Sequence, residues 1–282
     1  MINPICLYHR ADLDGKCSGY IVSRFVPDVE LLGVNYGEDV PWDQLAGRPV
    51  YLVDFSLQPW SEMERLKEIA APLVWIDHHQ SAIEEYEKSN IKINCLLDTK
   101  LAACELTWKF FSSEPAPRPV YLLGRYDVWD LDAQRDVLPF QMGMRLWDWH
   151  PAKDKEQWDV LMRFSSRAWE IAGQGRVVIE YQKRQNRGMM RKSFEHTWRD
   201  LRFLVVNAGG INSQAFESKY DPATHDAVMS FIFDGKQWIV SLYSPDQSRD
   251  LSVIAKEMGG GGHKAACGFQ IKSLSEIGIG SG

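Results

Sequence analysis

The stretch HRADLDG, residues 9–15, brings three potential metal ligands together within six residues and ends in a glycine. The ligands are His9, Asp12 and Asp14, and they come directly after the apolar run PICLY. One interpretation is a polar turn, in which Asp and Gly serve the turn geometry. The other is a set of side chains presented to a metal ion at the end of a strand. The remainder of the chain decides between the two.

Short apolar runs and stretches with helical spacing alternate through the first half of the chain. The runs are rich in Val, Leu and Ile without clean polar alternation, which is typical of buried strands. They are PICLYH at 4–9, VELLGV at 29–34, VYLVDF at 50–55 and LVWID at 73–77. Helical spacing lies between and after them, at 15–25, 58–71 and 101–111. This alternation predicts an α/β fold with a mostly parallel sheet covered by helices, and ligands bind such sheets beyond the carboxyl ends of the strands.

The length of 282 residues suits two domains. We expect an N-terminal catalytic, metal-binding domain over 1–150 and a helical connector over 151–202. A smaller C-terminal α/β domain over 203–282 would contain a glycine-rich loop, because the pattern changes there to the strand-like runs FLVVNA, AVMSFIF and WIVSLYS. The expected active site lies in the cleft between the two domains.

Composition and charge exclude several classes of protein. The chain is 45% hydrophobic and 25% charged, with no apolar stretch near the roughly 20 residues of a membrane span. The first apolar run is too short for a signal peptide, and the five cysteines show no CxxC pairing, so we expect a cytoplasmic protein with free thiols and no membrane partner. The net charge of −6 disfavours binding to long duplex nucleic acid. The oligomeric state stays open, a dimer included.

Basic residues gather in one part of the chain. Residues 176–202 contain eight Lys and Arg against three acidic residues. One interpretation is the solvated face of a helix, and the other is a basic wall along a substrate cleft.

Acidic residues and histidines follow three of the four predicted N-terminal strands. A single Asp at a strand end usually caps a helix. Several at one edge of one sheet are harder to explain, because clustered carboxylates repel one another unless a cation neutralises them. The residues are His9, Asp12, Asp14, Asp54, Asp77, His78 and His79, with a further acidic pair, Asp127 and Asp130, in GRYDVWD.

Mixed Asp and His ligands suit Mn²⁺ or a similar divalent ion, with Mg²⁺ and Co²⁺ as alternatives, better than a structural zinc site. The ligand count is sufficient for two ions. Two ions roughly 3.5–4 Å apart can activate water and hold a phosphoryl group. The sequence therefore indicates a site for two metal ions, which would need a bridging carboxylate to hold them so close together.

The stretch GGGGHKAACGF, residues 259–269, follows a predicted helix at 251–258. Glycines let backbone N–H groups approach an anion, and such a nest binds phosphate or carboxylate. The alternative is a flexible helix cap and linker. We favour the anion site, because the apolar pattern resumes directly in HKAACGF.

Together, HRADLDG, VDF, DHH and GGGGHKAACGF resemble the DHH phosphoesterase family, specifically its members with the DHH-associated C-terminal domain. The resemblance spans nearly the whole chain in the order of the family motifs. It implies that His9 and Asp12 hold one metal ion, that Asp14 and His78 hold the other, and that Asp54 bridges both. Its fourth motif is matched by Asp127 or Asp130, with Asp127 preferred, while Asp98 is expected to cap a helix. The usual AAG of the family reads AACG here.

The same resemblance implies that Asp77 supports the site from behind and that His79 faces the reacting phosphate. In the C-terminal domain it assigns substrate binding to Arg249, Gly260, Gly261, Gly262 and His263. Family members act on short RNA, single-stranded DNA, 3′-phosphoadenosine 5′-phosphate, cyclic dinucleotides or pyrophosphate. The GRYDVWD motif is most similar to the nano-RNase branch, so we expect an exonuclease of the oligoribonuclease type that degrades very short oligonucleotides. The alternatives are the mononucleotide and cyclic substrates, single-stranded DNA, or nucleotide binding without catalysis.

Overall fold

The structure is a computed structural model that describes residues 2–280, and it contains two compact units. The first unit comprises Met1–Ile179 and the second Glu180–Gly282. Helix α9, Ser165–Met190, contributes residues to both units.

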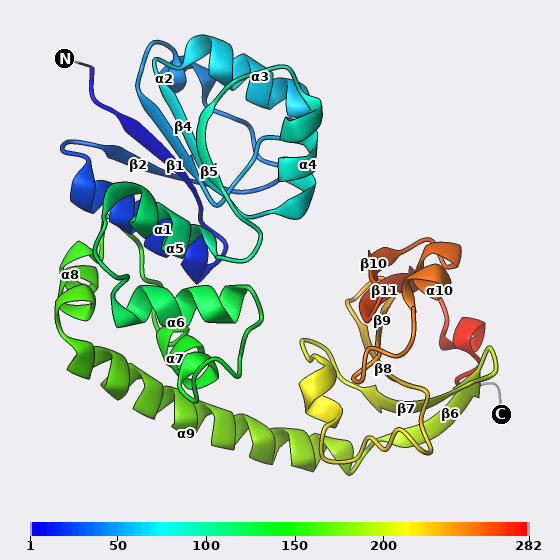
Figure 1. The fold of residues 1–282 in the computed structure, drawn as a ribbon. Helices are drawn as coiled ribbons and strands as arrows, with labels where there is room; N and C mark the ends of the chain where they lie inside the picture. The colour runs from blue at the N-terminus through cyan, green and yellow to red at the C-terminus, as the bar shows by residue number, and fades with distance from the viewer. Residues whose placement is uncertain (1, 281–282) are drawn as a thin grey trace. The chain divides into compact units, whose positions relative to one another are not determined.

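The first unit contains a five-stranded sheet in the order β2-β1-β3-β4-β5, in which every neighbouring pair is parallel (Figure 1). Its strands are β1 Ile5–His9, β2 Glu30–Val34, β3 Val50–Val53, β4 Leu73–Asp77 and β5 Asn94–Leu97. Since all strands run the same way, their carboxyl ends meet at one edge, and residues that follow different strands come together there.

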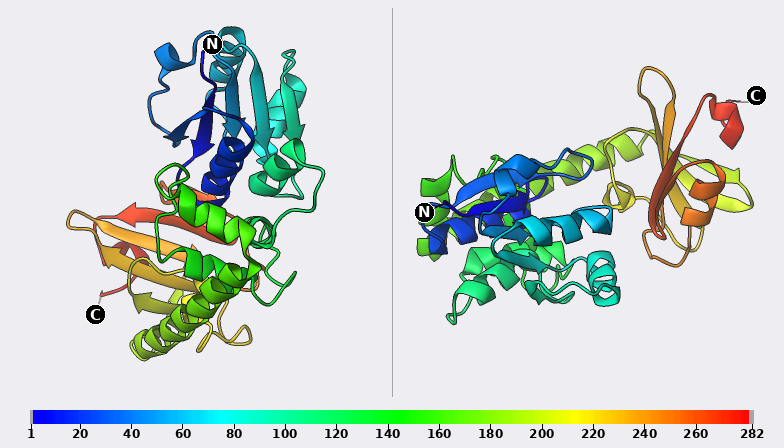
Figure 2. Two further views of the ribbon diagram at one scale, coloured as in Figure 1. Left: turned by 90° about the vertical axis from the view of Figure 1, so that its left-hand side faces the viewer. Right: turned by 90° about the horizontal axis from the view of Figure 1, so that it is seen from above.

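Helices cover both faces of this sheet, and each face has its own apolar core. Ile5 and Leu7 of β1 point into one core, which also contains residues of α2 Trp42–Leu45, α3 Trp60–Ile69 and α4 Gln80–Lys88. Cys6 and Tyr8 point into the other core, which also contains residues of α1 Leu13–Phe25 and α5 Ala103–Phe111. Figure 2 shows helices on both sides of this sheet. Burial on both faces explains why the strands read as continuous apolar runs.

A helical layer follows the sheet and completes the first unit. It comprises α6 Arg118–Asp127, α7 Val137–Met144, α8 Lys155–Arg163 and the first part of α9. These helices share an apolar core with α1 and α5 that includes Phe140, Trp149 and Trp158. The end of α6 is thereby held close to the start of α1 and α5, where the polar residues gather.

The second unit contains a six-stranded sheet in the order β10-β11-β9-β8-β7-β6. The strands are β6 Phe194–Trp198, β7 Leu201–Asn207, β8 Ala227–Phe233, β9 Trp238–Tyr243, β10 Gly261–His263 and β11 Ala266–Ile271. The pair β7–β8 is parallel and the other pairs are antiparallel. Helix α10, Ser252–Glu257, packs against β10 and β11, and short 3-10 helices lie at Ser213–Phe216 and Leu274–Ile277.

The α/β fold class is confirmed, with the parallel sheet flanked by helices and a second sheet domain. Three details differ from expectation. Strand β5 was not predicted, because its four residues NCLL are too short to give a pattern. The expected helical connector at 151–202 contains α8 and α9 but also β6, and the compact units divide at residues 179 and 180.

The third difference lies in the glycine-rich stretch, which was expected to be a loop and in which Gly261–His263 forms strand β10. A Cβ on Gly260 would lie 2.1 Å from the carbonyl oxygen of Gly268, and one on Gly262 would lie 2.6 Å from the Cα of Cys267. Glycine therefore allows this segment to pair closely with β11. Within residues 2–280, no helix combines the length and the apolar character needed to cross a membrane.

Candidate metal centre

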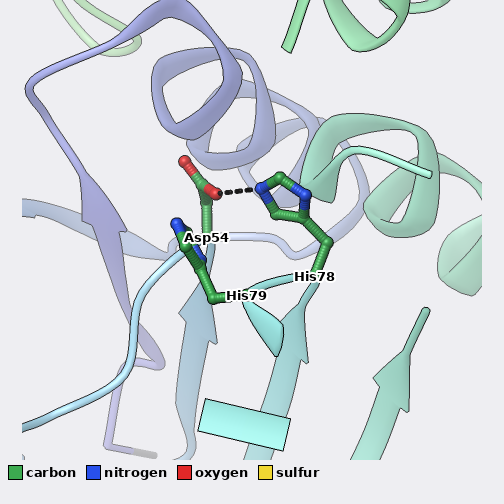
Figure 3. Close-up of side chains that lie close together, drawn as sticks. All are labelled: Asp54, His78 and His79. Atoms are coloured by element: carbon green, nitrogen blue, oxygen red, sulfur yellow. Dashed lines mark ion pairs between the residues drawn. The ribbon is translucent and has the colours of Figure 1, made fainter. Parts of the chain in front are cut away.

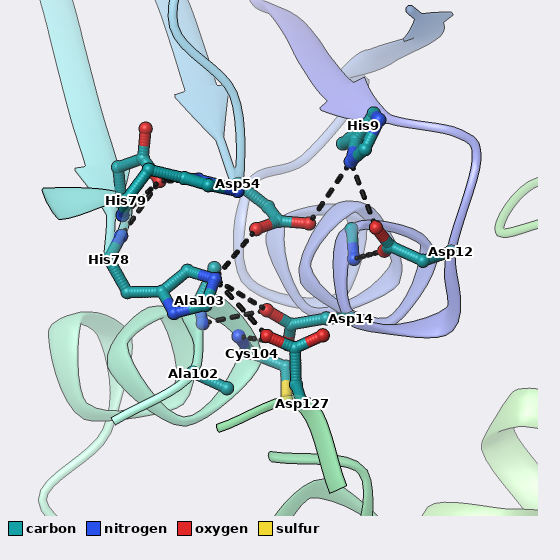
Figure 4. Close-up of polar contacts among 12 residues, drawn as sticks. His9, Asp12, Asp14, Asp54, His78, His79, Ala102, Ala103, Cys104 and Asp127 are labelled. Carbon is teal, nitrogen blue, oxygen red and sulfur yellow. Dashed lines mark hydrogen bonds and ion pairs between the residues drawn. The ribbon is translucent and has the colours of Figure 1, made fainter. Parts of the chain in front are cut away.

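The carboxyl edge of the first sheet brings together the polar residues that follow three strands (Figure 4). His9 is the last residue of β1, Asp54 follows β3, and Asp77 ends β4 immediately before His78 and His79. The remaining members lie on helices: Asp12 caps α1, Asp14 is in its first turn, and Asp127 ends α6.

The turn from β1 into α1 depends on Asp12 and Gly15. Asp12 is the N-cap of α1, and its Oδ1 accepts the backbone N–H of Gly15 at 2.9 Å. A Cβ on residue 15 would lie 2.0 Å from the carbonyl oxygen of His9. The glycine therefore lets the first turn of the helix pack directly on the strand end, and it is inside the helix rather than in the turn. Asp12 thus caps the helix, as the turn interpretation expects, and the same side chain also faces His9 in the cluster, while metal binding stays a prediction.

Asp54 has a left-handed backbone conformation, with φ of +55°. Aspartate tolerates this region better than most residues, but the conformation is still unfavourable for a side chain with a Cβ. Such conformations persist where the surrounding structure imposes them, and they concentrate at functional sites. Asp54 is only 1% exposed, and its carboxylate lies in the middle of the cluster.

At one end of the cluster, His9 faces Asp12 and Asp54. Its Nδ1 lies 2.9 Å from Asp12 Oδ2 and 3.7 Å from Asp54 Oδ2. Nδ1 and Asp54 Oδ2 are buried and have no hydrogen-bond partner among the described residues. The opposite ring atom, Nε2, lies 3.2 Å from Asn35 Oδ1 and can donate to it. Nδ1 then presents a lone pair to two carboxylates, an arrangement that a shared cation would stabilise.

At the other end, His78 Nε2 faces three carboxylates. It lies 3.4 Å from Asp54 Oδ1, 3.8 Å from Asp14 Oδ2 and 3.2 Å from Asp127 Oδ2. Asp14 is 3% exposed, and its two oxygens accept the backbone N–H groups of Ala103 and Cys104 at 2.8 Å each. Asp14 therefore receives the free N–H groups at the start of α5, which fixes its carboxylate and favours its charged form.

Asp77 lies behind the cluster and orients the two histidines that follow it. Its Oδ1 accepts the backbone N–H of His78 at 2.7 Å and contacts Nδ1 of His79 at 2.7 Å. Its Oδ2 lies 3.3 Å from Nε1 of the buried Trp75. With Nδ1 occupied, the His79 ring offers Nε2 towards Asp54 and His78, with which it forms a close group (Figure 3).

The charges of this cluster shift the pKa values of its members strongly. Burial and the Asp54 carboxylate raise the pKa of Asp14 to about 8, and burial and Asp14 raise that of Asp127 to about 7. Burial also raises the pKa of Asp54 well above its usual value. The close carboxylates of Asp12 and Asp54 stabilise the charged imidazolium and raise the pKa of His9 to about 10. Without a cation, the cluster therefore retains protons at neutral pH, and a divalent ion would replace them.

Asp54 lies between two groups of side chains that could hold metal ions. One group contains His9, Asp12 and Asp54, and the other contains Asp14, His78 and Asp127; within each group the ligand atoms lie within 4.8 Å of one another. Asp54 Oδ1 lies 3.4 Å from Nε2 of His78 and so connects the first group to the second. Carboxylates and imidazoles in this mixture could bind divalent ions, and the buried atoms of His9 and Asp54 that lack hydrogen-bond partners fit such a role.

The two acidic alternatives in this region have other surroundings. Asp130 lies 3.5 Å from Arg125 and is exposed, and the structure does not bring it to His78. Asp98 accepts the backbone N–H of Lys100 in the turn before α5, whose N-cap is Ala102. Asp98 thus shapes the approach to the helix without capping it, because Asp14 takes the N–H groups there.

The residues predicted to bind substrate lie in the second unit. Gly259 and Gly260 end α10 in a Schellman motif, in which the N–H of Gly260 donates to Ala255 at 2.7 Å and that of Gly259 to Lys256 at 3.0 Å. Gly261, Gly262 and His263 form the edge strand β10, with the His263 side chain exposed. Arg249 pairs with Asp226 at 2.6 Å. The helix-cap interpretation therefore applies to the first two glycines, while the others form part of the sheet.

Several of the basic residues at 176–202 are in ion pairs. Arg176 pairs with Asp136, Arg199 with Glu257, and Arg202 with Asp226. Lys183 pairs with Glu180 at 3.6 Å on the exposed surface of α9, and Arg187 is exposed on the same helix. The solvated-face interpretation accounts for much of this segment.

Sequence reasoning missed Asn35 and the N–H groups of Ala103 and Cys104. Asn35 directly follows β2, so the strand-end rule that selected His9 and Asp54 would have found it. The N–H groups of α5 leave no signal, because any residue provides them.

Part of the first unit is similar to a known protein family. Residues 4–125 match the DHH family, N-terminal domain. The uncharacterized protein R106 of Acanthamoeba polyphaga mimivirus is 23% identical over 252 residues, which cover 82% of this chain and 55% of that protein. The chain therefore spans about half the length of this curated relative.

Two solved structures share the fold. The pGpG-specific phosphodiesterase PggH from Vibrio cholerae has a TM-score of 0.60 at 12% identity, covering 97% of this chain and 95% of that one. An exopolyphosphatase-related protein from Bacteroides fragilis has a TM-score of 0.53 at 12% identity, covering 98% and 89%. At these identities the likeness establishes the fold and leaves the substrate to be argued separately.

Proposed function

We propose that the protein is a two-metal phosphodiesterase, dependent on Mn²⁺, that hydrolyses very short oligonucleotides to mononucleotides. The observation that carries the proposal is the pair of ligand groups joined by Asp54 at the carboxyl edge of the first sheet. A mononuclear site would not need a second set of ligands around His78. The pGpG specificity of one structural neighbour favours the shortest substrates, since pGpG is a dinucleotide.

The residues divide the work of hydrolysis as follows. His9 and Asp12 would hold one ion, Asp14, His78 and Asp127 the other, and Asp54 both. When bound, the ions supply a nucleophile at neutral pH and neutralise the charge that develops on the phosphate. His79 would donate a hydrogen bond to a phosphate oxygen, and hydrogen bonding to Asp77 raises the pKa of His79 to about 9, which keeps it a donor at neutral pH.

The second unit would hold the remainder of the substrate. His263 and Gly261 lie on the edge strand, and Arg249 carries a half-exposed guanidinium. Charged donors of this kind suit a terminal phosphate. The proposed substrate therefore has one phosphate for the metal centre and another phosphate or base for the second unit.

A substrate panel with Mn²⁺ tests this proposal. It contains RNA of two to about ten nucleotides, 3′-phosphoadenosine 5′-phosphate, a cyclic dinucleotide, single-stranded DNA and pyrophosphate. We expect fast hydrolysis of the shortest RNA and slower hydrolysis as length increases. Hydrolysis of only the mononucleotide or the cyclic substrate would support the proposed metal centre but contradict the proposed oligonucleotide substrate.

Two aspartates three residues apart provide a matched control. Asp127→Asn removes a carboxylate that faces His78, whereas Asp130→Asn removes an exposed partner of Arg125. We expect Asp127→Asn to lower kcat by about 100-fold or more and Asp130→Asn to leave it within about twofold. The reverse result would show that the fourth acidic ligand has been misassigned.

A further inference from the structure

Trp129 has a backbone conformation that a bulky residue rarely adopts. Its φ is +60°, in the left-handed region where a Cβ clashes with the neighbouring carbonyl. Its side chain is 59% exposed, the highest value of the eleven tryptophans. Because the indole is exposed, packing in the apolar core cannot account for the unfavourable backbone conformation of Trp129.

The position itself favours glycine. Helix α6 ends at Asp127, and the N–H of Trp129 donates to Tyr126 at 3.0 Å while that of Asp130 donates to Arg125 at 2.8 Å. This is a Schellman motif with Trp129 at the left-handed position, where glycine is usual because it has no Cβ. A glycine there would keep both hydrogen bonds without strain. The fold of the helix end therefore does not require tryptophan.

A second tryptophan shows what a structural reason looks like. Trp149 also has a positive φ, of +53°, but it is buried, donates from Nε1 to the carbonyl oxygen of Met144 at 2.8 Å, and packs edge-on against Trp158. Core packing thus holds its backbone. Trp129, in contrast, makes an edge contact with Tyr126 at 5.7 Å between ring centroids and leaves most of the indole in solvent.

Trp129 lies next to the metal centre in the chain. Asp127, two residues earlier, places its Oδ2 3.2 Å from Nε2 of His78. Two residues span at most about 7 Å, so the indole starts within that distance of a ligand-bearing Cα. Exposed aromatic rings beside a phosphate site bind nucleic-acid bases by stacking. Strain that the fold does not need is typical of such sites.

We propose that Trp129 stacks on one base of the oligonucleotide substrate while the neighbouring carboxylates and histidines act on its phosphodiester. This inference rests on the proposed function and adds a residue that recognises the base instead of the phosphate. A stacking residue accepts any base, because every base has a π face. The expected selectivity is therefore for substrates that carry a base at one position over those that lack it.

Three substitutions separate the ring from the strain. Trp129→Phe keeps an aromatic ring and the backbone strain. Trp129→Ala keeps the strain, because alanine has a Cβ, but removes the ring. Trp129→Gly removes the ring and the strain. Trp169→Ala is the matched control, because Trp169 is also exposed but lies under Arg118, at the end of α6 opposite to Asp127. The substrates are a dinucleotide and two analogues of it, each with an abasic sugar at one of the two positions, hydrolysed with Mn²⁺.

We expect Trp129→Ala and Trp129→Gly to lower kcat/KM for the intact dinucleotide by about tenfold, the scale of one lost base–aromatic stack. For one of the two abasic analogues, the kcat/KM of these two variants should equal that of the unmodified protein, because that analogue lacks the base that Trp129 would stack on. Trp129→Phe should retain most of the activity, and Trp169→Ala all of it. Thermal unfolding gives a readout independent of activity: the Gly variant should melt a few degrees above the Ala variant and no lower than the unmodified protein.

Three results would overturn the inference. These are an equal loss on intact and abasic substrates, no loss on either, or a Gly variant that melts well below the unmodified protein, which would show that the indole serves packing. Failure of the unmodified protein to hydrolyse any dinucleotide would instead overturn the proposed function, and the inference with it.

Discussion

Asp54 and Asp136 are both buried carboxylates of the first unit, each 1% exposed, but their surroundings are opposite. Asp136 receives two guanidinium groups, from Arg118 at 2.8 Å and Arg176 at 3.0 Å. Asp54 faces histidines and further carboxylates, and one of its oxygens lacks a hydrogen-bond partner among the described residues. Two arginines supply the counter-charge of Asp136, whereas we expect divalent cations to supply that of Asp54. The contrast predicts a structural role for Asp136 and a metal-binding role for Asp54.

Replacing each aspartate by asparagine tests this contrast, and it should give the largest effect. Asp54→Asn removes the ligand shared by both groups, so we expect kcat to fall by about 10³-fold or more. The metal-free protein should keep its stability, because burial raises the pKa of Asp54 and an asparagine is close in shape to the protonated acid. Asp136→Asn should instead cost about 1–3 kcal/mol of stability, since two guanidinium groups lose their partner. Activity assays and urea unfolding of both variants measure this. Near-normal turnover of Asp54→Asn would refute the bridging assignment.

The next effect is the stability that metal ions add. Mn²⁺ at about 100 times its Kd should stabilise the protein by about 2.7 kcal/mol per site, and Asp54→Asn should lose most of this gain.

In the metal-free protein, the raised pKa values of Asp14, at about 8, and Asp127, at about 7, mean that the folded state holds protons that the unfolded state releases above pH 4. These groups therefore make the metal-free protein less stable as pH rises from about 5 to 8.

His9, with its pKa raised to about 10, contributes in the same direction. Its stabilisation is complete below about pH 6.5, the pKa of unfolded histidine, and is lost as pH rises through 10. Metal ions displace these protons, so the stability gained from Mn²⁺ should increase with pH. Urea unfolding at pH 5.5, 7 and 8.5, with Mn²⁺ and with EDTA, checks the sign. A gain that is independent of pH would contradict the protonation scheme.

Substitution of Asn35 should have a smaller effect on metal binding than substitution of Asp54. Asn35 contacts His9, one proposed ligand, through its Oδ1. Asn35→Ala removes the acceptor that holds Nε2 protonated and Nδ1 free, and should weaken binding at that end by about 10- to 100-fold. Asn35→Asp keeps an acceptor and should restore most of the affinity. Calorimetric titration with Mn²⁺ measures both variants. Unchanged affinity in Asn35→Ala would mean that the orientation of His9 is fixed by other contacts.

The smallest effect should come from the second unit, whose exposed His263 lies on an edge strand outside the buried cluster. His263→Ala should raise KM several-fold and change kcat less, because it supplies binding shared by the ground and transition states. Steady-state kinetics on a dinucleotide test this. An unchanged KM would remove His263 from the substrate site.

The sequence predicted the framework of the site because each part depends on local pattern. Apolar runs without alternation predicted the four strands β1 to β4, and the polar residues after them indicated one edge. The close approach at Gly15, the left-handed backbone of Asp54 and the capping of α5 by Asp14 were not predictable, because they depend on segments distant in the sequence. The choice between Asp127 and Asp130 likewise required the end of α6 to be placed beside His78. The roles of the individual residues remain predictions for the variants above.

The central claim is that the Asp54 cluster binds two divalent ions, and the most direct test is equilibrium titration of the metal-free protein with Mn²⁺. The account predicts two ions per chain for the unmodified protein and for Asp136→Asn, and fewer than two for Asp54→Asn. Saturation at a single ion, or the same stoichiometry in Asp54→Asn as in the unmodified protein, would contradict it.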